Sequence, residues 1–301
     1  MSAKNFSTSQ PSQGAIATEA GTAIADPEPI PRLSQTALNR LEKCPRWFQN
    51  SLIEHRESPL DPQQQQRLAR GNQFHQLMQQ RELGLPVETL LGEDDPLRQW
   101  MQDFLERAPS HITPNPFCGS IEHREAEHER RLVWQDILWL VRYDLLLLSP
   151  DQAQILDWKT YPRPRSPKQL RNTWQTRLYP FVLAETSSYP PDAISMTYWF
   201  VEGSPSQESE SSSNSPEQPS QCWQFNYSQL DHQKTRQDLE TLAQQFHHYW
   251  RAYQQGQDFP RRGPAGGACD LSNCFCQTLD SLGQPAACPP TALKEIPEVS
   301  L

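Results

Sequence analysis

The spacing of apolar residues is helical in the first third of the chain. Ser34 is a favourable N-cap, and the apolar residues after it recur on one helical face that is interrupted near Pro45. A Gln-rich segment over 62–82 and a shorter segment over 97–107 have the same spacing. The pattern therefore predicts helices in these three regions.

The pattern changes near residue 121, where segments rich in Val, Ile, Leu, Trp and Tyr are separated by turn residues. Three such segments predict an antiparallel meander of strands over 121–134, 136–148 and 153–160. The rest of the chain predicts a helix over 167–185, strands over 193–201 and 222–227, and a long helix that Ser228 caps and that ends near Gln255.

Composition indicates that part of the chain does not join a core. The 301 residues include 28 prolines and 12 glycines, 36% of the residues are hydrophobic, and the mean hydropathy is −0.77. Globular domains have about 45–50% apolar residues. Low-complexity segments at 1–30, 202–220 and 289–301 are therefore expected to be disordered. A single domain is expected over 31–288, with a cysteine-rich tail over 259–288.

The net charge of −9 argues against a nucleic-acid partner until its distribution is considered. The three low-complexity segments carry −2, −4 and −1 in chain order, which leaves −2 for the rest of the chain. The segment 159–177, by contrast, contains six Lys or Arg residues and no acid. A DNA-binding basic surface is expected from Arg163, Arg165, Lys168 and Arg171.

The seven cysteines are an odd number, and the sequence has no cationic and apolar leader. Both observations argue against a secreted disulfide framework. No apolar run approaches the roughly 18 residues that a membrane span needs. The sequence therefore predicts a cytoplasmic protein without a membrane partner.

The segment 141–160, VRYDLLLLSPDQAQILDWKT, contains the residues with the clearest chemistry. If 149–152 is a loop between antiparallel strands, Asp144 lies opposite Asp157, and Lys159 shares a face with Asp157. Facing carboxylates repel each other, and a divalent cation between them is the simplest compensation. Because an adjacent lysine can stabilise charge on a phosphate, the arrangement predicts metal-dependent phosphodiester hydrolysis.

Other interpretations of these residues stay open on this evidence. The acids could be solvated on an exposed hairpin, or Asp157 could pair with Arg142. In the helix that follows, Arg171, Gln175 and Tyr179 are spaced i, i+4 and i+8 and share a face that can point towards the acids. The alternative for this helix is a polar face in water, with its apolar residues packed inward.

Five short motifs follow one another along the chain. They are Leu33-Ser34 through Cys44-Pro45-Arg46-Trp47-Phe48, Gly71-x-x-x-His75, Asp144, Asp157-Trp158-Lys159-Thr160, and Gln175-x-x-x-Tyr179. In this order they resemble the RecB-type branch of the PD-(D/E)XK nuclease superfamily, which includes AddB-type repair enzymes and the CRISPR-adaptation exonucleases. The resemblance spans about 33–276. It implies an α/β fold with a restriction-endonuclease-like core, in which helices flank a small mixed β-sheet, and with helical N-terminal elements.

The resemblance also implies a role for each matched residue. The implied metal ligands are His75, Asp144 and Asp157, and the imidazole favours Mn²⁺ somewhat over Mg²⁺. The implied catalytic residues are Asp144, Asp157, Lys159, Gln175 and Tyr179. Lys159 would orient the attacking water, and the Gln and Tyr would position the DNA backbone or the lysine. Taken without the resemblance, His75 would be interpreted as a surface residue of its helix.

Cysteines lie on both sides of the expected nuclease core. Many members of this branch hold an iron–sulfur cluster, and a [4Fe–4S] cluster needs four thiolates. The ligands that the resemblance implies are Cys44, Cys269, Cys274 and Cys276. Their C-x4-C-x-C spacing departs from the family pattern, Cys288 is an alternative ligand, and zinc or ordinary thiols are alternative interpretations. Cys118 and Cys222 are isolated in sequence and are interpreted as core or incidental residues.

The expected function is metal-dependent hydrolysis of DNA, at ends or on single strands, by an exonuclease that acts in repair or recombination. A helicase or another repair protein is the expected partner besides DNA. The alternative is a non-catalytic DNA-binding or scaffold protein that retains the nuclease fold, because Val141 stands where family members have glycine. The acidic balance of the chain predicts modest and salt-sensitive affinity for DNA.

Overall fold

The computed structural model describes residues 31–56, 60–92, 95–107, 121–161, 166–201 and 222–261. The segments expected to be disordered and the cysteines after residue 261 lie outside these ranges, as does Cys118. In the part of the chain that the structure describes, no helix is long and apolar enough to cross a bilayer.

The N-terminal helices form where the apolar spacing predicts them. Ser34 caps α1 (Gln35–Lys43) by accepting a hydrogen bond from the backbone N–H of Ala37. Pro45 cannot continue that helix and instead begins α2 (Pro45–Phe48), which runs into the π-helical turn η1 (Gln49–Ile53). The longer helices α3 (Pro62–Glu82), α4 (Pro96–Arg107) and α8 (Gln229–Gln254) agree with their predicted bounds to within one or two residues.

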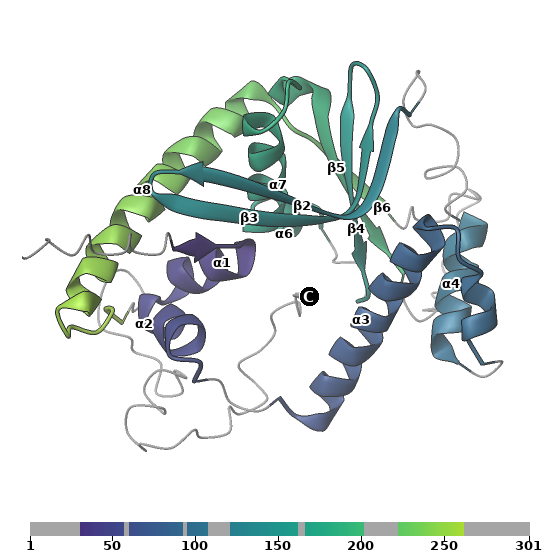
Figure 1. The fold of residues 1–301 in the computed structure, drawn as a ribbon, viewed down its shortest axis with the longest axis horizontal. Coiled ribbons are helices and arrows are strands. Elements are labelled where there is room, and N and C mark those ends of the chain that lie inside the picture. The colour runs from purple at the N-terminus through teal and green to yellow at the C-terminus, as the bar shows by residue number, and fades with distance from the viewer. Residues whose placement is uncertain are drawn as a thin grey trace, which may run out of the picture. The chain divides into compact units, whose positions relative to one another are not determined.

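Six strands form one mixed sheet (Figure 1). They are β1 (Arg32–Leu33), β2 (His123–Trp134), β3 (Ile137–Leu148), β4 (Ala153–Lys159), β5 (Ile194–Phe200) and β6 (Cys222–Asn226). The predicted meander of β2, β3 and β4 is confirmed; β5 then pairs parallel with β4, and β6 antiparallel with β5. The sheet and its flanking helices confirm the predicted fold class.

The predicted helix over 167–185 is wrong in one respect, because it is two helices. They are α6 (Lys168–Arg171) and α7 (Trp174–Glu185). Thr173 ends the first by donating its hydroxyl to the Leu170 carbonyl at 2.9 Å, and it caps the second through the N–H of Thr176. Arg171 therefore does not share a helical face with Gln175.

The sheet buries an apolar core on each of its faces. On one face, α1, α7 and α8 pack over a core that includes Trp139, Tyr143 and Phe181. On the other, α3 and α4 cover Leu145 and Trp158. In the view of Figure 1, α1 and α8 lie at the left and α3 and α4 at the right. All residues of β4 and β5 are buried, because these central strands are covered on both sides.

The strand β3 forms a fork with its neighbours. β2 pairs along the whole of one edge, while the other edge pairs with β1 at 138–139 and with β4 at 145–148. Between these two contacts, residues 140–144 have no strand partner on that edge among the described residues. The edge of β3 is therefore open in its middle, and side chains of other elements can enter there.

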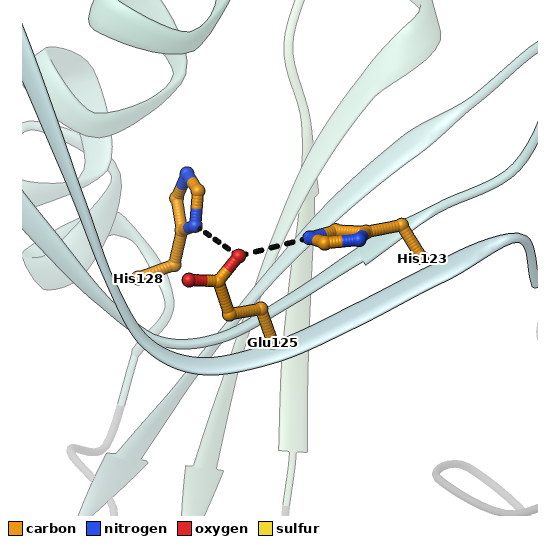
Figure 2. A group of neighbouring side chains, drawn as sticks. All are labelled: His123, Glu125 and His128. Carbon is orange, nitrogen blue, oxygen red and sulfur yellow. Dashed lines mark hydrogen bonds and ion pairs between the residues drawn. The ribbon is translucent and has the colours of Figure 1, made fainter.

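The strand β2 departs from extended geometry at Glu127. The two-residue turn Gln135–Asp136, with φ of 55° and 54°, joins β2 to β3 and sets their register. That register pairs Ala126 with Leu145 and His128 with Tyr143, so Glu127 lies level with Asp144. Glu127 has a φ of 52°, and the ribbon bends between the labelled residues Glu125 and His128 (Figure 2). The irregular residue thus lies directly across from a predicted metal ligand.

The segment after α8 returns to the N-terminal helices. Phe259 donates its backbone N–H to Gln49 Oε1 at 2.6 Å, and Arg46 donates to the Phe259 and Pro260 carbonyls and pairs with Asp258 at 2.6 Å. The Phe259 ring is buried and stacks on Phe48 with ring centroids 5.9 Å apart. The two ends of the described chain are therefore held against each other.

Replacement of Phe259 by alanine should test this contact. Phe259→Ala removes a fully buried ring and is expected to lower the free energy of unfolding by about 3 kcal/mol. Leu230→Ala on α8 is the control: its side chain is 75% exposed, and a change of less than about 0.5 kcal/mol is expected. Urea denaturation of both variants measures the difference. Equal midpoints would show that the segment is not packed as described.

Candidate active site

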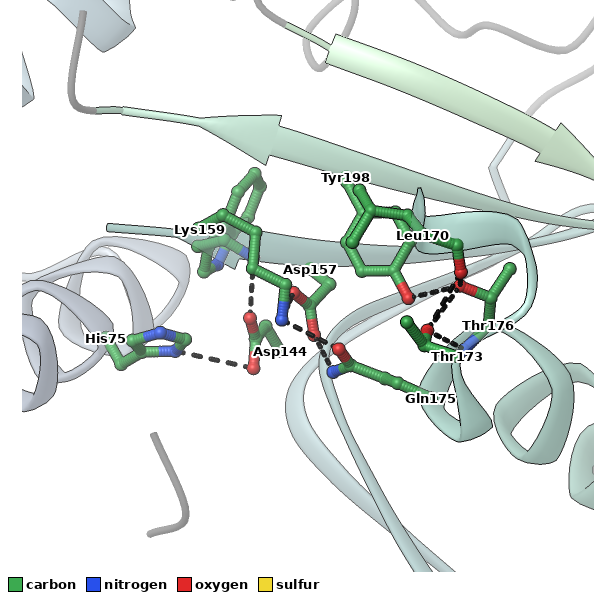
Figure 3. A network of polar contacts seen from close by, with 10 residues as sticks. His75, Asp144, Asp157, Lys159, Leu170, Thr173, Gln175, Thr176 and Tyr198 are labelled. Atoms are coloured by element: carbon green, nitrogen blue, oxygen red, sulfur yellow. Dashed lines mark hydrogen bonds and ion pairs between the residues drawn. The ribbon is translucent and has the colours of Figure 1, made fainter. Parts of the chain in front are cut away.

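The open middle of the β3 edge forms the floor of a cavity of about 240 Å³. Its walls are the first turn of α1, the end of β4, and side chains from α3 and α7. All the implied metal and catalytic residues line it, and Figure 3 shows most of them converging. They are His75, Asp144, Asp157, Lys159, Gln175 and Tyr179. The structure therefore brings together six residues that are far apart in sequence.

Asp144 lies where β3 and β4 separate. The pairing of the two strands ends at Leu145 and Leu156, and the next facing pair would be Asp144 and Asp157, as predicted. Instead of a main-chain ladder contact, Asp144 Oδ2 accepts a hydrogen bond of 2.6 Å from the backbone N–H of Trp158. The carboxylate thus takes the place of a strand partner for that N–H group and holds the fork open.

Asp157, Lys159 and Gln175 form a closed polar network (Figure 3). Lys159 Nζ lies 2.7 Å from Asp157 Oδ1 and donates to Gln175 Oε1 at 2.7 Å. Gln175 Nε2 in turn donates to Asp157 Oδ2 at 2.5 Å. All three side chains are buried, and Asp157 is only 3% exposed. The solvated hairpin and the Asp157–Arg142 pair are therefore both wrong, and Arg142 instead lies 3.4 Å from Glu129.

Burial and neighbouring charges shift the titration of this network. Burial raises the pKa of Asp157, and the Asp144 carboxylate raises it further, whereas Lys159 lowers it. Burial would lower the pKa of Lys159, but the contact with Asp157 holds that pKa well above its ordinary value. Lys159 is therefore a permanent cation held in one position by two acceptors.

His75 enters the site from α3. It is only 7% exposed, so the interpretation as a surface histidine is wrong. Burial lowers the pKa of His75, but Asp144 and Asp157 raise it by more, and the net shift is upward. Its Nδ1 atom faces Asp144 Oδ1 at 3.4 Å without a hydrogen bond of good geometry. A buried imidazole nitrogen thus faces a carboxylate without a hydrogen bond.

Glu127 is a residue of the site that the sequence analysis missed. The carboxylates of Glu127 and Asp144 and the imidazole of His75 offer ligand atoms that all lie within 4.8 Å of one another. Burial and the charge on Asp144 raise the pKa of Glu127 to about 7. The position of Glu127 follows from the two-residue turn at Gln135–Asp136. This turn contains no Asn-Gly or Asp-Gly pair, which is the usual sequence signal of a two-residue hairpin.

Gln175 and Tyr179 both come from buried turns of α7, so a water-facing polar side of this helix is excluded. The Tyr179 ring lies 5.4 Å from that of Tyr143, whose hydroxyl donates to the Tyr179 carbonyl at 3.0 Å. Val141 is also buried and lines the cavity wall. The side chain that replaces the family's glycine therefore narrows this wall.

The expected DNA-binding residues are not all in the described chain. Arg163 and Arg165 lie outside the described residues. Lys168 and Arg171 are exposed on α6, which precedes α7, and the Arg171 guanidinium lies over the Phe225 ring at 5.3 Å. Arg171 thus packs on the outer strands of the sheet and does not point into the cavity.

Of the implied cluster ligands, only Cys44 is described. It is buried between α1 and α2, next to Arg46, whose backbone N–H donates to the Pro260 carbonyl at 3.1 Å. The chain therefore passes Cys44 shortly before it reaches the three later cysteines, which lie outside the described residues. Cys222 is half-buried at the start of β6.

The donor set of the cavity fits a divalent cation. Four carboxylates, those of Glu127, Glu129, Asp144 and Asp157, line the cavity together with one imidazole and only two permanent cations, Arg142 and Lys159, so negative charge is in excess. The His75 nitrogen lacks a good hydrogen-bond donor or acceptor, and 3.4 Å is a normal separation between two ligands of one ion. Asp157 already contacts Lys159 and Gln175, but each carboxylate oxygen has a second lone pair for a cation.

Comparison with known protein families identifies the class of protein. The model of the PD-(D/E)XK nuclease superfamily matches residues 32–278, which is most of the chain. The chain belongs to this superfamily, and that part of the sequence prediction is confirmed; the assignment to the RecB-type branch stays a prediction. Members of the superfamily use divalent metals, and the His75, Glu127 and Asp144 group is of the kind that binds them.

Comparison with solved structures finds more distant likenesses. A protein from Eubacterium rectale, provisionally named as an exonuclease, is 9% identical, with a TM-score of 0.46 over 82% of this chain and 87% of that chain. The protein SSO0001 is 10% identical, with a TM-score of 0.31 over 72% of this chain and 77% of that one. No curated protein matches the sequence.

The raised pKa of Glu127 predicts a pH-dependent stability of the metal-free protein. Because the native state binds this proton more tightly than the unfolded chain, the contribution is full below the ordinary pKa of 4.5 and is lost as the pH rises through about 7. In EDTA, Glu127→Gln should therefore be more stable than the wild type at pH 8, by about 1–2 kcal/mol after solvent screening. The two proteins should differ little at pH 5.

Urea denaturation at both pH values measures this difference. Glu122→Gln is the matched control, because Glu122 is exposed at the start of the same strand and its loss should leave the pH profile unchanged. A wild-type profile that Glu127→Gln reproduces at every pH would contradict the burial of this carboxylate beside Asp144.

Proposed function

We propose that this protein is a metal-dependent deoxyribonuclease that hydrolyses phosphodiester bonds at DNA ends or in single strands. The observation that carries the proposal is the contact of Lys159 with Asp157 and Gln175, beside Asp144 and His75 in one cavity. Paired acids, a buried lysine and an imidazole are the groups that phosphodiester hydrolysis needs. Membership of the nuclease superfamily supports the same chemistry.

The buried network assigns a separate task to each side chain. Lys159 presents a cation that Asp157 and Gln175 hold in place, so it can stabilise the charge that develops on a phosphate without reorganising. A divalent cation held by His75, Asp144 and Asp157 would polarise the phosphate and lower the pKa of a bound water. Mn²⁺ suits the imidazole ligand better than Mg²⁺ does. Tyr179 borders the cavity and would position the DNA backbone.

The cavity supports a strand end or a single strand as the substrate. Its volume of about 240 Å³ accommodates part of one nucleotide, and Val141 narrows one wall. Lys168 and Arg171 are exposed on α6 and supply positive charge near the N-terminal end of α7. We place the activity in DNA repair or recombination, with a helicase or another repair protein as partner.

A cleavage assay with purified full-length protein tests the proposal. With Mn²⁺, the wild type should degrade linear single-stranded DNA, and Asp157→Ala and Lys159→Ala should each lower the rate by at least about 100-fold, because each removes a charge from the network. Lys234→Ala on the exposed side of α8 is the control and should cleave at the wild-type rate.

Two further substrates separate the modes of cleavage. Circular single-stranded DNA should resist an enzyme that needs ends, and blunt duplex should react more slowly than single strands. If no substrate is cleaved with any divalent metal, the nuclease proposal fails and the non-catalytic scaffold replaces it.

We also propose that Cys44, Cys269, Cys274 and Cys276 hold a [4Fe–4S] cluster. The docking of residues 258–260 beside Cys44 supports it, because Cys269 comes only eight positions after Arg261, and this length of chain can span up to about 26 Å. Such a cluster would fasten the end of the chain to the α1–α2 corner. It needs four thiolates, and Cys44 would be the one that precedes the nuclease core.

Anaerobic purification tests for the cluster. The wild type should be brown, with broad visible absorption and with iron and sulfide in equal amounts, and Cys44→Ser should lose most of both. Cys222→Ser should keep them, since Cys222 lies in β6 and not at the α1–α2 corner. Colourless protein that contains zinc in place of iron would overturn the cluster and leave a zinc site.

A further inference from the structure

A second group of metal-binding side chains lies on β2, outside the candidate active site. It consists of His123, Glu125 and His128, whose ligand atoms all lie within 4.8 Å of one another (Figure 2). One oxygen, Glu125 Oε2, lies 2.9 Å from His123 Nε2 and 2.7 Å from His128 Nδ1. The two imidazoles thus converge on one carboxylate, and none of the three residues lines the active-site cavity.

A regular strand would not bring these side chains together. His123 and Glu125 are two residues apart and share a face, but His128 is three residues from Glu125 and would point to the opposite face. The left-handed backbone of Glu127, with a φ of 52°, breaks this alternation. Figure 2 shows all three side chains on the inner side of the resulting turn in the ribbon.

The ring of His128 is held in place by a ring of the core. It stacks on Tyr143 with the ring planes 15° apart and the centroids separated by 6.1 Å. Tyr143 is fully buried and its hydroxyl is fixed by the Tyr179 carbonyl, so this platform belongs to the rigid core. The His123 ring meets that of His128 edge-on at 6.4 Å. The nitrogen of His128 therefore has a defined position before any ligand binds.

The donor types select one class of ion. Two neutral imidazoles and one carboxylate are the ligands of catalytic-type zinc sites, in which the fourth position is open to water. Mg²⁺ and Ca²⁺ prefer oxygen ligands and would gain little from the imidazoles. With bonds of about 2.0–2.1 Å, tetrahedral zinc separates its ligand atoms by about 3.3 Å. The observed 2.7 and 2.9 Å require an opening of about half an ångström, which the exposed side chains of His123 and Glu125 can supply.

We propose that His123, Glu125 and His128 bind a zinc ion on the inner side of the bend in β2. The ion would fasten the strand on both sides of Glu127, and so hold the turn that places Glu127 level with Asp144. The proposed zinc site shares no residue with the candidate active site. It therefore stands or falls independently of the nuclease activity.

Zinc binding by the metal-free full-length protein tests the proposal. Equilibrium dialysis with elemental analysis should show one zinc equivalent that His123→Ala, His128→Ala and Glu125→Gln each lose, or bind more than about tenfold more weakly. Glu125→Gln keeps both imidazoles and the shape of the side chain. A loss of zinc binding in this variant therefore cannot be attributed to misfolding. Zinc should also raise the melting temperature of the wild type more than that of these variants.

The control variants exclude the other zinc ligands of the chain. His248→Ala removes an exposed histidine from α8 and should bind as much zinc as the wild type. All measurements are repeated in an Asp144→Asn background, which weakens metal binding by the group of His75, Glu127 and Asp144. Because the cysteines are the same in every variant, zinc bound by cysteines does not change the comparison. Co²⁺ should give the visible bands of a tetrahedral site, and these should disappear with His128→Ala. The proposal is overturned if the three site variants and His248→Ala bind zinc alike.

Discussion

The separation of β3 from β4 after Leu145 and Leu156 is the constraint on which the rest of the site depends. An antiparallel pair that continued past this point would place two carboxylates face to face within a ladder, where they repel. Asp144 instead accepts the Trp158 N–H, so the hydrogen bond that the ladder loses is replaced by one to a charged acceptor. The same separation leaves room for His75 from α3 and for Gln175 from α7.

The excess of negative charge in this cavity has to be supported by the surrounding core. Asp157 lies between Leu156 and Trp158, which point into the core under α3 and α4, while its own side chain faces α7. Packing on both faces fixes β4, so the carboxylate cannot move into water to escape its neighbours. Lys159 pairs with Asp157, and Gln175 contacts both side chains, whereas Asp144 and Glu127 are grouped with the His75 imidazole and do not contact Lys159. The proposed binding of a divalent ion would thus follow from how the sheet is buried.

Much of this arrangement follows from local sequence pattern, and the parts that do not have identifiable causes. The register that places Asp144 opposite Asp157 depends only on the short 149–152 loop. The position of this loop can be recognised in the sequence from the alternation of residues in the two strands. The same reasoning from a loop and strand alternation would have placed Glu127 opposite Asp144, if the β2–β3 turn had been located in the sequence. That turn, Gln135–Asp136, lacks the glycine that usually marks a two-residue hairpin. The break between α6 and α7 was missed because Thr173 caps a helix without interrupting the apolar spacing, and with it the position of Arg171 was wrong.

The fork also connects the site to both ends of the described chain. β1 pairs with β3 at 138–139, on the side of the opening away from β4, and Ser34 to Thr36 follow directly and line the cavity. The α1–α2 corner that comes next is held by Arg46 and Gln49 to residues 258–260. A change at that corner therefore reaches one wall of the cavity through a single nine-residue helix, α1, which packs on α7. Because α7 supplies Gln175, the position of Lys159 depends on the same packing. A ligand that fastened the chain after residue 261 to Cys44 would therefore stabilise this wall of the cavity without contacting it.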